Sequence, residues 1–443
     1  MKIQLSEHFT YPKLFRFVFP SIIMMIFTSI YGVVDGLFVS NYVGKTAFAA
    51  INLIMPFLMG VGAIGFMVGT GGSAIVSKTI GEGKTRQAKQ YFSMLVIFTF
   101  LAGLCITLLG QALLPTIAAA LDKTGNMAEN CILYGRILLC SLPFFMLQNV
   151  FQSFFVTAQK PVLGLMVAIA AGISNMFLDF LLIVVFDFGI AGAAIATAIS
   201  EFVGGGIPIF YFAAKNSSLL RFARPRWEGR VLLKACTNGS SELMTNLSMS
   251  VVNMLYNFQL MRFAGEDGVA AYGTIMYVNF IFISIYLGYS IGCAPIIGYH
   301  YGAGNHSELK NMFQKSLTAI VITGLGLTAL AWLCSTPLAR IFVGYDRELF
   351  YMTRHGFQLF VLSYLISGVN IFASAFFTAL NNGAVSAAIS FLRTLVFQVF
   401  VVLVLPFFLK INGIWLAVVF SEALSLAVSI CFFVKMKGKY HYI

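Results

Sequence analysis

The sequence predicts an all-α integral membrane protein with twelve transmembrane helices, arranged as two parallel six-helix pseudo-repeats around a central cavity. Hydrophobic residues make up 59% of the 443 residues, and Asp, Glu, Lys and Arg only 10%. A soluble domain carries about 25% charged residues, whereas twelve spans of ~20 residues need ~240 apolar ones. The apolar runs are long and unbroken, unlike the short alternating strands of a barrel. These numbers exclude a large soluble domain, a nucleic-acid reader and a secreted disulfide scaffold.

Apolar runs between polar breaks predict each span in order. The first run follows the polar, basic stretch from Met1 to Arg16 and continues for about 25 residues, which is too long for the core of a signal peptide. This first helix is therefore expected to stay in the chain. The predicted spans are approximately 14–42, 47–76, 91–114, 131–157, 162–187, 189–213, 235–263, 268–298, 312–334, 351–378, 384–409 and 413–435.

The basic residues orient these spans. Placing the N-terminus inside the cell puts most of the 28 Lys and Arg residues on the cytoplasmic side, which predicts that both termini are cytoplasmic and that the chain lies in the cytoplasmic (inner) membrane as a multi-pass protein. The net charge of +12 then faces anionic lipid. Membrane lipid is thus an expected partner, and nucleic acid is not.

The longest polar stretch divides the chain into two similar halves. It predicts an N-lobe at residues 1–214, a cytoplasmic linker at 215–234 and a C-lobe at 235–443. The halves match at a constant offset of 221 residues, and an even number of spans in each half makes the repeat parallel. The matched segments are VGKTAFAAINLIM (43–55) over AGEDGVAAYGTIM (264–276), Thr157-Ala158 over Thr378-Ala379, and Ser200-Glu201 over Ser421-Glu422.

Two acidic residues lie deep within predicted spans, where an isolated charge costs several kcal/mol and therefore indicates function. Asp35 and Asp179 each lie eight residues before the predicted outer end of their span, and Thr197 lies eight residues after the outer start of the next one. At 1.5 Å per residue, all three are about 12 Å below the external surface. The sequence therefore predicts oxygen ligands from three helices at one depth.

The spacing within these helices adds two residues to the predicted site. Asn175 shares a helix face with Asp179, and Ala193 shares one with Thr197. Carboxylate, amide and hydroxyl oxygens suit a small hard cation, and two close, desolvated carboxylates cannot easily both ionise. We predict a coupling site for H⁺ or Na⁺, with Na⁺, if used, held by Asp35, Asn175, Asp179 and Thr197. Alternatively, the two acids are unrelated, and each pairs with local hydroxyl groups or water.

The repeat provides an internal comparison for this site. A purely architectural set of polar residues would more naturally persist in both halves. At the offset of 221, each proposed donor instead lies over an apolar or aromatic residue: Asp35 over Tyr256, Asn175 over Val396, Asp179 over Phe400, and Thr197 over Val418. The scaffold is duplicated, and the cation chemistry is not.

Other polar residues within spans are secondary candidates. Glu201 and Glu422 occur at matching positions, which favours a shared structural role, such as accepting helix hydrogen bonds or pairing across the lobes, at least as much as transport. Glu242 and Arg393 lie in neighbouring helices and could form a buried ion pair; otherwise either could reach cytoplasmic water. Pro20 lies fifteen residues before Asp35 on the same helix and is a candidate hinge.

No motif in the sequence indicates an enzyme. GEGKT (81–85) lacks the first glycine of a phosphate loop and follows no strand. His300 and His306 have no metal-ligand spacing and are interpreted as surface residues. No HExxH or GxSxG pattern occurs. No cofactor is expected beyond the coupling ion.

Taken together, the chain resembles the multidrug and toxic compound extrusion (MATE) transporters of the MOP superfamily over nearly its whole length. The resemblance rests on the twelve spans in two halves, on VGKTAFAAINLIMP and GTGGSAIVSKTIGEGK, and on IGCAPIIGYHYGAGN. The chain is similar to the prokaryotic branch with an N-lobe cation site at Asp35, Asn175, Asp179, Ala193 and Thr197, and Pro20 matches the first-helix kink. The acidic cluster that other members carry in the C-lobe has no clear match, since Glu242 is displaced from it.

The resemblance implies a secondary antiporter that exports organic, usually cationic and amphipathic, compounds in exchange for H⁺ or Na⁺. Such a protein is expected to act as a monomer on small-molecule substrates. One alternative is a flippase for lipid-linked saccharides from the same superfamily, whose anionic substrates favour Arg or Lys facing the cavity. A second alternative is a receptor or non-catalytic structural subunit, against which the asymmetric buried acids argue.

Overall fold

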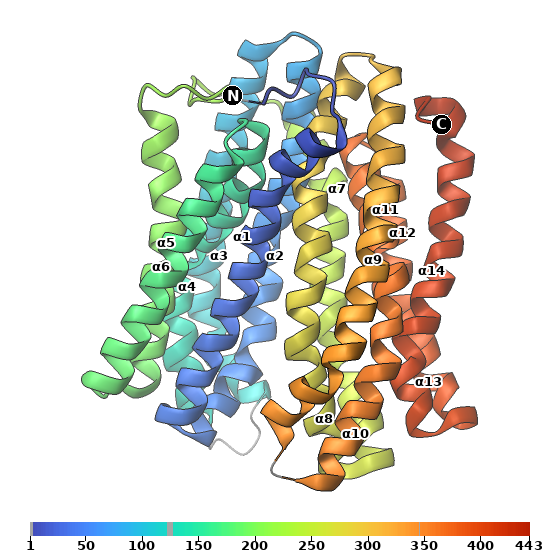
Figure 1. Ribbon diagram of the computed structural model, residues 1–443. Helices are drawn as coiled ribbons and strands as arrows, with labels where there is room; N and C mark the ends of the chain where they lie inside the picture. The colour runs from blue at the N-terminus through green and yellow to red at the C-terminus, as the bar shows by residue number, and fades with distance from the viewer. Residues whose placement is uncertain (1–2, 122–126, 345) are drawn as a thin grey trace.

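The computed structural model describes residues 3–121, 127–344 and 346–443, and every regular element in these ranges is a helix. Figure 1 shows the helices side by side in one bundle, with the two chain ends at the same end, here called the termini end. The α-helices are α1 (Tyr11–Phe38), α2 (Lys45–Gly81), α3 (Thr85–Leu121), α4 (Ala128–Thr157), α5 (Pro161–Asp179), α6 (Gly189–Ala213), α7 (Gly229–Asn238), α8 (Ser240–Gly302), α9 (His306–Val343), α10 (Arg347–Phe360), α11 (Tyr364–Ala379), α12 (Gly383–Phe391), α13 (Phe397–Leu409) and α14 (Ile411–Tyr440).

The predicted spans are all helical. Eleven helical segments in the described ranges are long and apolar enough to cross a membrane. The longest, α8, has 63 residues, which would extend about 95 Å if straight, three times the thickness of a bilayer core. It turns at Gly265, whose φ of 63° and ψ of −151° are conformations that glycine adopts readily. This one segment therefore provides the seventh and eighth predicted spans.

The helices form two groups. In the first, here called the N-lobe (α1–α6), α1 packs on α5, and α4 packs on α2, α3 and α6. In the second, the C-lobe (α8–α14), α8 packs on α10, α11 and α12, and α13 packs on α14. The segment that connects the two groups lies along α3. There, Phe222 stacks on Phe92, and the Ala223 N–H donates to Ser93. The seventh span starts later than predicted. A separate short helix, α7, ends at Asn238, and the span itself begins with α8 at Ser240.

The two lobes pack most closely in the half that carries the termini. Helices α1 and α2 both contact α8. A side chain added at Gly81 would collide with the carbonyl of Tyr299, and one added at Gly302 would collide with the carbonyl of Lys78. At these positions, only glycine lets the two backbones approach so closely.

The N-terminal segment lies on the opposite lobe from the helix that it precedes. The Phe9 N–H donates to Glu308 on α9, and its carbonyl accepts from Lys315. His8 lies 2.6 Å from the Glu308 carboxylate. Leu5 and Phe9 are fully buried in the C-lobe core. The start of α1 is therefore held by the C-lobe.

The repeat is visible in the backbone, but its register is not constant. Residues with positive φ recur 221 positions apart at Gly44 and Gly265, Gly83 and Gly304, and Gly189 and Lys410. At the turns that end α4 and α11, however, the matching pair is Gln159 (φ 62°) and Asn381 (φ 58°), 222 apart. The same offset relates two backbone bonds, Lys160 N to Phe155 O and Asn382 N to Phe377 O. The constant register predicted from sequence is therefore wrong here, and Thr378 lies over Val156.

π-Helical segments shift the register again. One follows α12 at Leu392–Val396, and another follows α5 at Phe180–Val185. Each widens the helix by one residue. Gly192 packs on Leu182 in the N-lobe, and its counterpart Gly413 packs on Leu405 in the C-lobe. The two leucines are 223 positions apart, so the offset in α13 is 223. The counterpart of Asn175 is therefore Gln398 rather than Val396, and that of Asp179 is Val402 rather than Phe400.

Candidate functional site

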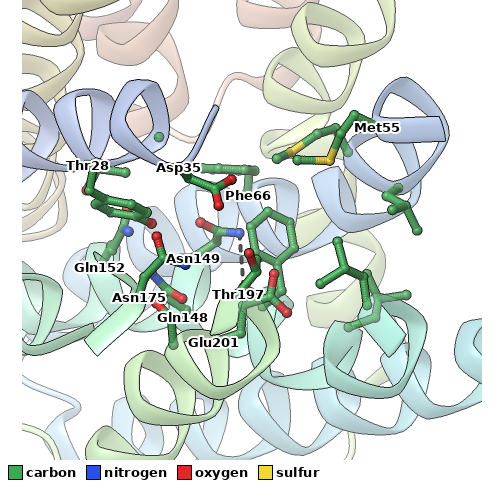
Figure 2. A pocket seen from close by; sticks show the side chains of 18 residues that line it. Thr28, Asp35, Met55, Phe66, Gln148, Asn149, Gln152, Asn175, Thr197 and Glu201 are labelled. Carbon is green, nitrogen blue, oxygen red and sulfur yellow. Dashed lines mark hydrogen bonds between the residues drawn. The ribbon is translucent and has the colours of Figure 1, made fainter. Parts of the chain in front are cut away.

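A cavity of about 260 Å³ lies within the N-lobe and contains most of the predicted site (Figure 2). It has acidic and amide groups on one side and apolar or aromatic groups on the other. Its lining comes from α1 (Thr28, Tyr31, Gly32, Asp35), α2 (Met55, Leu58, Met59, Phe66), α4 (Leu138, Leu142, Phe145, Gln148, Asn149, Gln152), α5 (Asn175) and α6 (Thr197, Ser200, Glu201).

Two carboxyl groups meet at the edge of this cavity. Asp35 lies in the last turn of α1, directly before a π-helical segment at Val39–Val43, and Asp179 is the last residue of α5, directly before another. Asp179 is fully buried, and the two groups interact electrostatically. The fold therefore brings together two acids that lie 144 positions apart in the chain and that the sequence analysis placed at one depth.

Besides the contact between the Asp35 and Asp179 carboxyl groups, several oxygens at this site have no hydrogen-bond donor of ordinary geometry in the ranges that the structure describes. Both carboxylate oxygens of Asp179, Oδ1 of Asp35, Oδ1 of Asn175 and Oγ1 of Thr197 are buried without a partner in the part of the chain that the structure describes. Buried polar atoms are normally bonded, and leaving one unbonded costs about 1–3 kcal/mol. Such a set of oxygens fits a guest that supplies positive charge, whether a proton or a small hard cation.

The predicted residues do not all reach the cavity. Asp35, Asn175 and Thr197 line it. Asp179 and Ala193 are buried beside it and are not part of its lining. No group of three or more His, Cys, Asp and Glu side chains suited to a metal occurs within the described ranges. A metal ion here would therefore rely on two carboxylates, supplemented by amide and hydroxyl oxygens.

Helix α4 contributes functional residues that the sequence analysis did not identify. Gln148, Asn149 and Gln152 line the cavity and are at most 8% exposed. Figure 2 shows their amide groups on the same side of the cavity as Asn175. The signal was present as LQNVFQ (147–152), three amide side chains within an otherwise apolar span.

The C-lobe pairs its intramembrane charges differently from the prediction. Arg393 does not pair with Glu242. Its Nε atom lies 2.9 Å and 3.0 Å from the two carboxylate oxygens of Glu422, and its Nη2 atom lies 2.8 Å from Oε1. The Asn370 amide also donates to Glu422 at 2.7 Å. The pair with Glu242 was considered because the repeat makes the two helices neighbours, although the estimated depths of the two residues differ. Arg393 lies in a π-helical segment, which alters the direction of its side chain.

The two matching glutamates therefore do not share one role. Glu422 is 3% exposed and bonded on both oxygens. Glu201 lines the N-lobe cavity, and its Oε2 atom is buried without a partner among the residues described. Glu422 does not pair across the lobes, because its partners Arg393 and Asn370 belong to its own lobe.

Two further expectations concern Pro20 and His300. Pro20 is a buried residue inside α1; its neighbours Ser21 and Ile22 lie against Gly288 of α8. His300 is 1% exposed, so its interpretation as a surface residue is wrong. The N-terminal segment covers this end of α8, and the sequence alone gave no indication of that cover.

Comparisons with known proteins agree with this architecture. The sequence model of the MatE family matches residues 20–181 and again 243–404, once in each lobe. The multidrug export protein MepA of Staphylococcus saprophyticus is 23% identical over 420 residues, covering 94% of this chain and 90% of that protein.

Solved structures share the fold. A crystal structure of MATE in complex with MaL6 matches with a TM-score of 0.92 at 21% identity, covering 97% of each chain. A multidrug resistance MATE family transporter in an outward-facing conformation matches with a TM-score of 0.91 at 21% identity, covering 97% of this chain and 96% of that one.

Proposed function

The chain belongs to the MatE family, and we propose that it exports organic, mainly cationic and amphipathic, compounds across the cytoplasmic membrane in exchange for H⁺ or Na⁺. The observation that carries this proposal is the set of unbonded buried oxygens at Asp35, Asn175, Asp179 and Thr197. Relatives named as multidrug export proteins support the substrate class.

The N-lobe oxygens couple the cation to export. A proton or Na⁺ that binds between Asp35 and Asp179 cancels one negative charge at this pair and thereby removes the repulsion between two carboxylates. Because Asp35 is on α1 and Asp179 on α5, binding changes how these two helices pack. Helix α1 also contacts α8, so the change is transmitted to the other lobe, with Pro20 as the hinge. Release of the cation on the other side of the membrane returns the carrier.

The state described here is the outward-facing one. The lobes are most tightly packed at the termini end, where glycines bring α2 and α8 together, and the fold matches a relative described as outward-facing. With both termini cytoplasmic, the packed end is the closed cytoplasmic side. The protein acts as a monomer, because one chain provides both lobes. The cavity lining contains Asp35 and Glu201 but no Lys or Arg, which disfavours an anionic lipid-linked saccharide.

Transport by the purified protein in proteoliposomes tests the proposal. Ethidium export is measured with a Na⁺ gradient or a pH gradient imposed alone, and at least one gradient is expected to drive it. Asp35→Asn removes the ionisable group with little change in shape and is expected to abolish gradient-driven export. The matched control is Tyr256→Phe, which alters the counterpart of Asp35 in the C-lobe and leaves export intact. Normal export by a well-inserted Asp35→Asn protein would refute the coupling role.

A further inference from the structure

Glu201 and Glu422 occupy equivalent places in the two lobes. Each follows a serine on the last span of its lobe, 221 positions apart. Helix α6 begins at Gly189, and α14 begins directly after Lys410. Both of these residues have a positive φ. Gly192 and Gly413, one turn later, both pack on the backbone of the preceding helix. The serine, the residue of positive φ and the packed glycine therefore fix the register around the two glutamates.

In the C-lobe, this place holds a guanidinium group. Arg393 presents Nε and Nη2 to Glu422, in a fork of contacts between 2.8 and 3.0 Å. Asn370 completes the arrangement, bonding Glu422 with its amide nitrogen and Ser429 with its oxygen. A planar guanidinium matches a carboxylate through two parallel bonds, which a point charge cannot do.

The N-lobe keeps the acceptor and lacks the donor. At the offset of 222 found at the ends of α4 and α11, Gln148 lies over Asn370. The same offset, carried to the second residue of the π-helical segment, places Ala171 over Arg393. Ala171 offers only a methyl group, and its carbonyl is bonded by Ser200 at 2.9 Å. Glu201, Gln148 and Ser200 line the cavity, and Glu201 retains an unbonded oxygen.

The walls around Glu201 suit a flat cation. Tyr31, Phe66 and Phe145 line the same cavity as Glu201, and Figure 2 labels Phe66 and Glu201 among its lining residues. Aromatic faces attract cations, and guanidinium groups in particular stack on them. The volume of about 260 Å³ exceeds what a bare metal ion needs. Glu201 is also distinct from the pair Asp35 and Asp179, which already meets the needs of a coupling ion.

We propose that Glu201, with Gln148 beside it, is a binding subsite for the guanidinium or amidinium group of an exported compound, equivalent to the place that Arg393 fills in the C-lobe. This rests on the proposed export function for its physiological meaning, although binding itself does not require a gradient. The subsite selects cations that carry several N–H donors in one plane over cations that carry none.

Two lipophilic monocations test this selectivity: dodecylguanidinium, which has N–H donors, and tetraphenylphosphonium, which has none. Equilibrium binding is measured with the purified full-length protein in nanodiscs, without a gradient. Glu201→Gln is expected to weaken dodecylguanidinium binding about tenfold or more, the loss typical of a hydrogen bond to a charged group, and to change tetraphenylphosphonium binding less than threefold. The control is Glu242→Gln, another intramembrane acid that does not line the cavity; both affinities should stay unchanged.

A second variant does not depend on removing the carboxylate. Ala171→Arg provides a tethered guanidinium at the position that Arg393 has in the C-lobe, and it is expected to exclude dodecylguanidinium while leaving Glu201 in place. Equal weakening of both probes by Glu201→Gln, or unchanged dodecylguanidinium binding, overturns the proposal. Failure of gradient-driven ethidium export with intact Glu201-dependent binding would instead count against the export function alone.

Discussion

The N-lobe and C-lobe use one scaffold but treat the buried polar groups at three matched places in opposite ways. In the C-lobe, Tyr256 donates to Gln398 at 2.9 Å, and Glu422 is held by Arg393 and Asn370. At the matching places in the N-lobe, Asp35, Asn175 and Glu201 each keep a buried oxygen without a partner in the described residues. At these three matched places the C-lobe satisfies its own polar groups, whereas the N-lobe has retained groups that a guest can satisfy. At these places, function can thus be located by asking which member of a matched pair of positions leaves its hydrogen bonds unmade.

The sharpest way to test this comparison is to unpair the C-lobe charges. Glu422→Gln leaves the Arg393 guanidinium in a buried place without its carboxylate, and such a change costs about 3–5 kcal/mol. We expect a large fall in the thermal unfolding temperature of the detergent-solubilised protein. Glu201→Gln, at the matching place in the N-lobe, should cost less than about 1 kcal/mol, because no ion pair is broken and Gln still offers an oxygen as acceptor.

A double variant separates loss of the pair from loss of packing. Arg393→Met combined with Glu422→Met replaces both charges by apolar groups of similar volume and should restore most of the stability. If the single and double variants are equally unstable, packing rather than charge pairing explains the effect, and the contrast between the lobes weakens.

A second test concerns the contact between the lobes. Gly81→Ala introduces a methyl group that collides with the Tyr299 backbone, and overpacking of this kind costs about 1–3 kcal/mol. We expect lower thermal stability and greater access of a water-soluble thiol reagent to a cysteine placed at this interface. Gly206→Ala is the control, because a methyl group there meets nothing within 4 Å; equal destabilisation by both variants would contradict the tight packing described.

The smallest effect is expected at the neutral pair of the C-lobe. Tyr256→Phe removes the hydroxyl that bonds Gln398, at a cost of about 0.5–1.5 kcal/mol. The unfolding temperature should fall slightly, and the ratio of export driven by the two ion gradients should not change. A change in that ratio would mean that the C-lobe also takes part in ion coupling.

Much of the fold could be predicted from composition alone, because a bilayer requires long apolar helices and admits few alternatives. The acids could be predicted for the same reason, since a charge at the depth of Asp35 or Asp179 stands out against an apolar background. The amides of α4 were equally visible but were passed over because an uncharged side chain costs less to bury.

The register and the pairing of Arg393 could not be predicted. A π-helical segment adds one residue without any distinctive sequence, so nothing in LRTLV (392–396) indicates that the offset changes there. One residue moves a side chain by about 100° around a helix. The segment adds one of the two residues by which Gln398 replaces Val396 as the counterpart of Asn175; the other is already present at the turns that end α4 and α11.

The attachment of residues 3–10 to the C-lobe has a mechanical consequence for α1. Its first turns are fastened to one rigid body through Phe9 and the contact of Ile22 with Gly288, while its far end carries Asp35 into the other body. Any relative rotation of the two bodies must therefore be absorbed as bending or torsion within this single helix. Pro20, which cannot bond the carbonyl of Arg16, lies two residues before Ile22, at the end of the stretch held by the C-lobe. Bending that starts there would displace the part of α1 that carries Asp35.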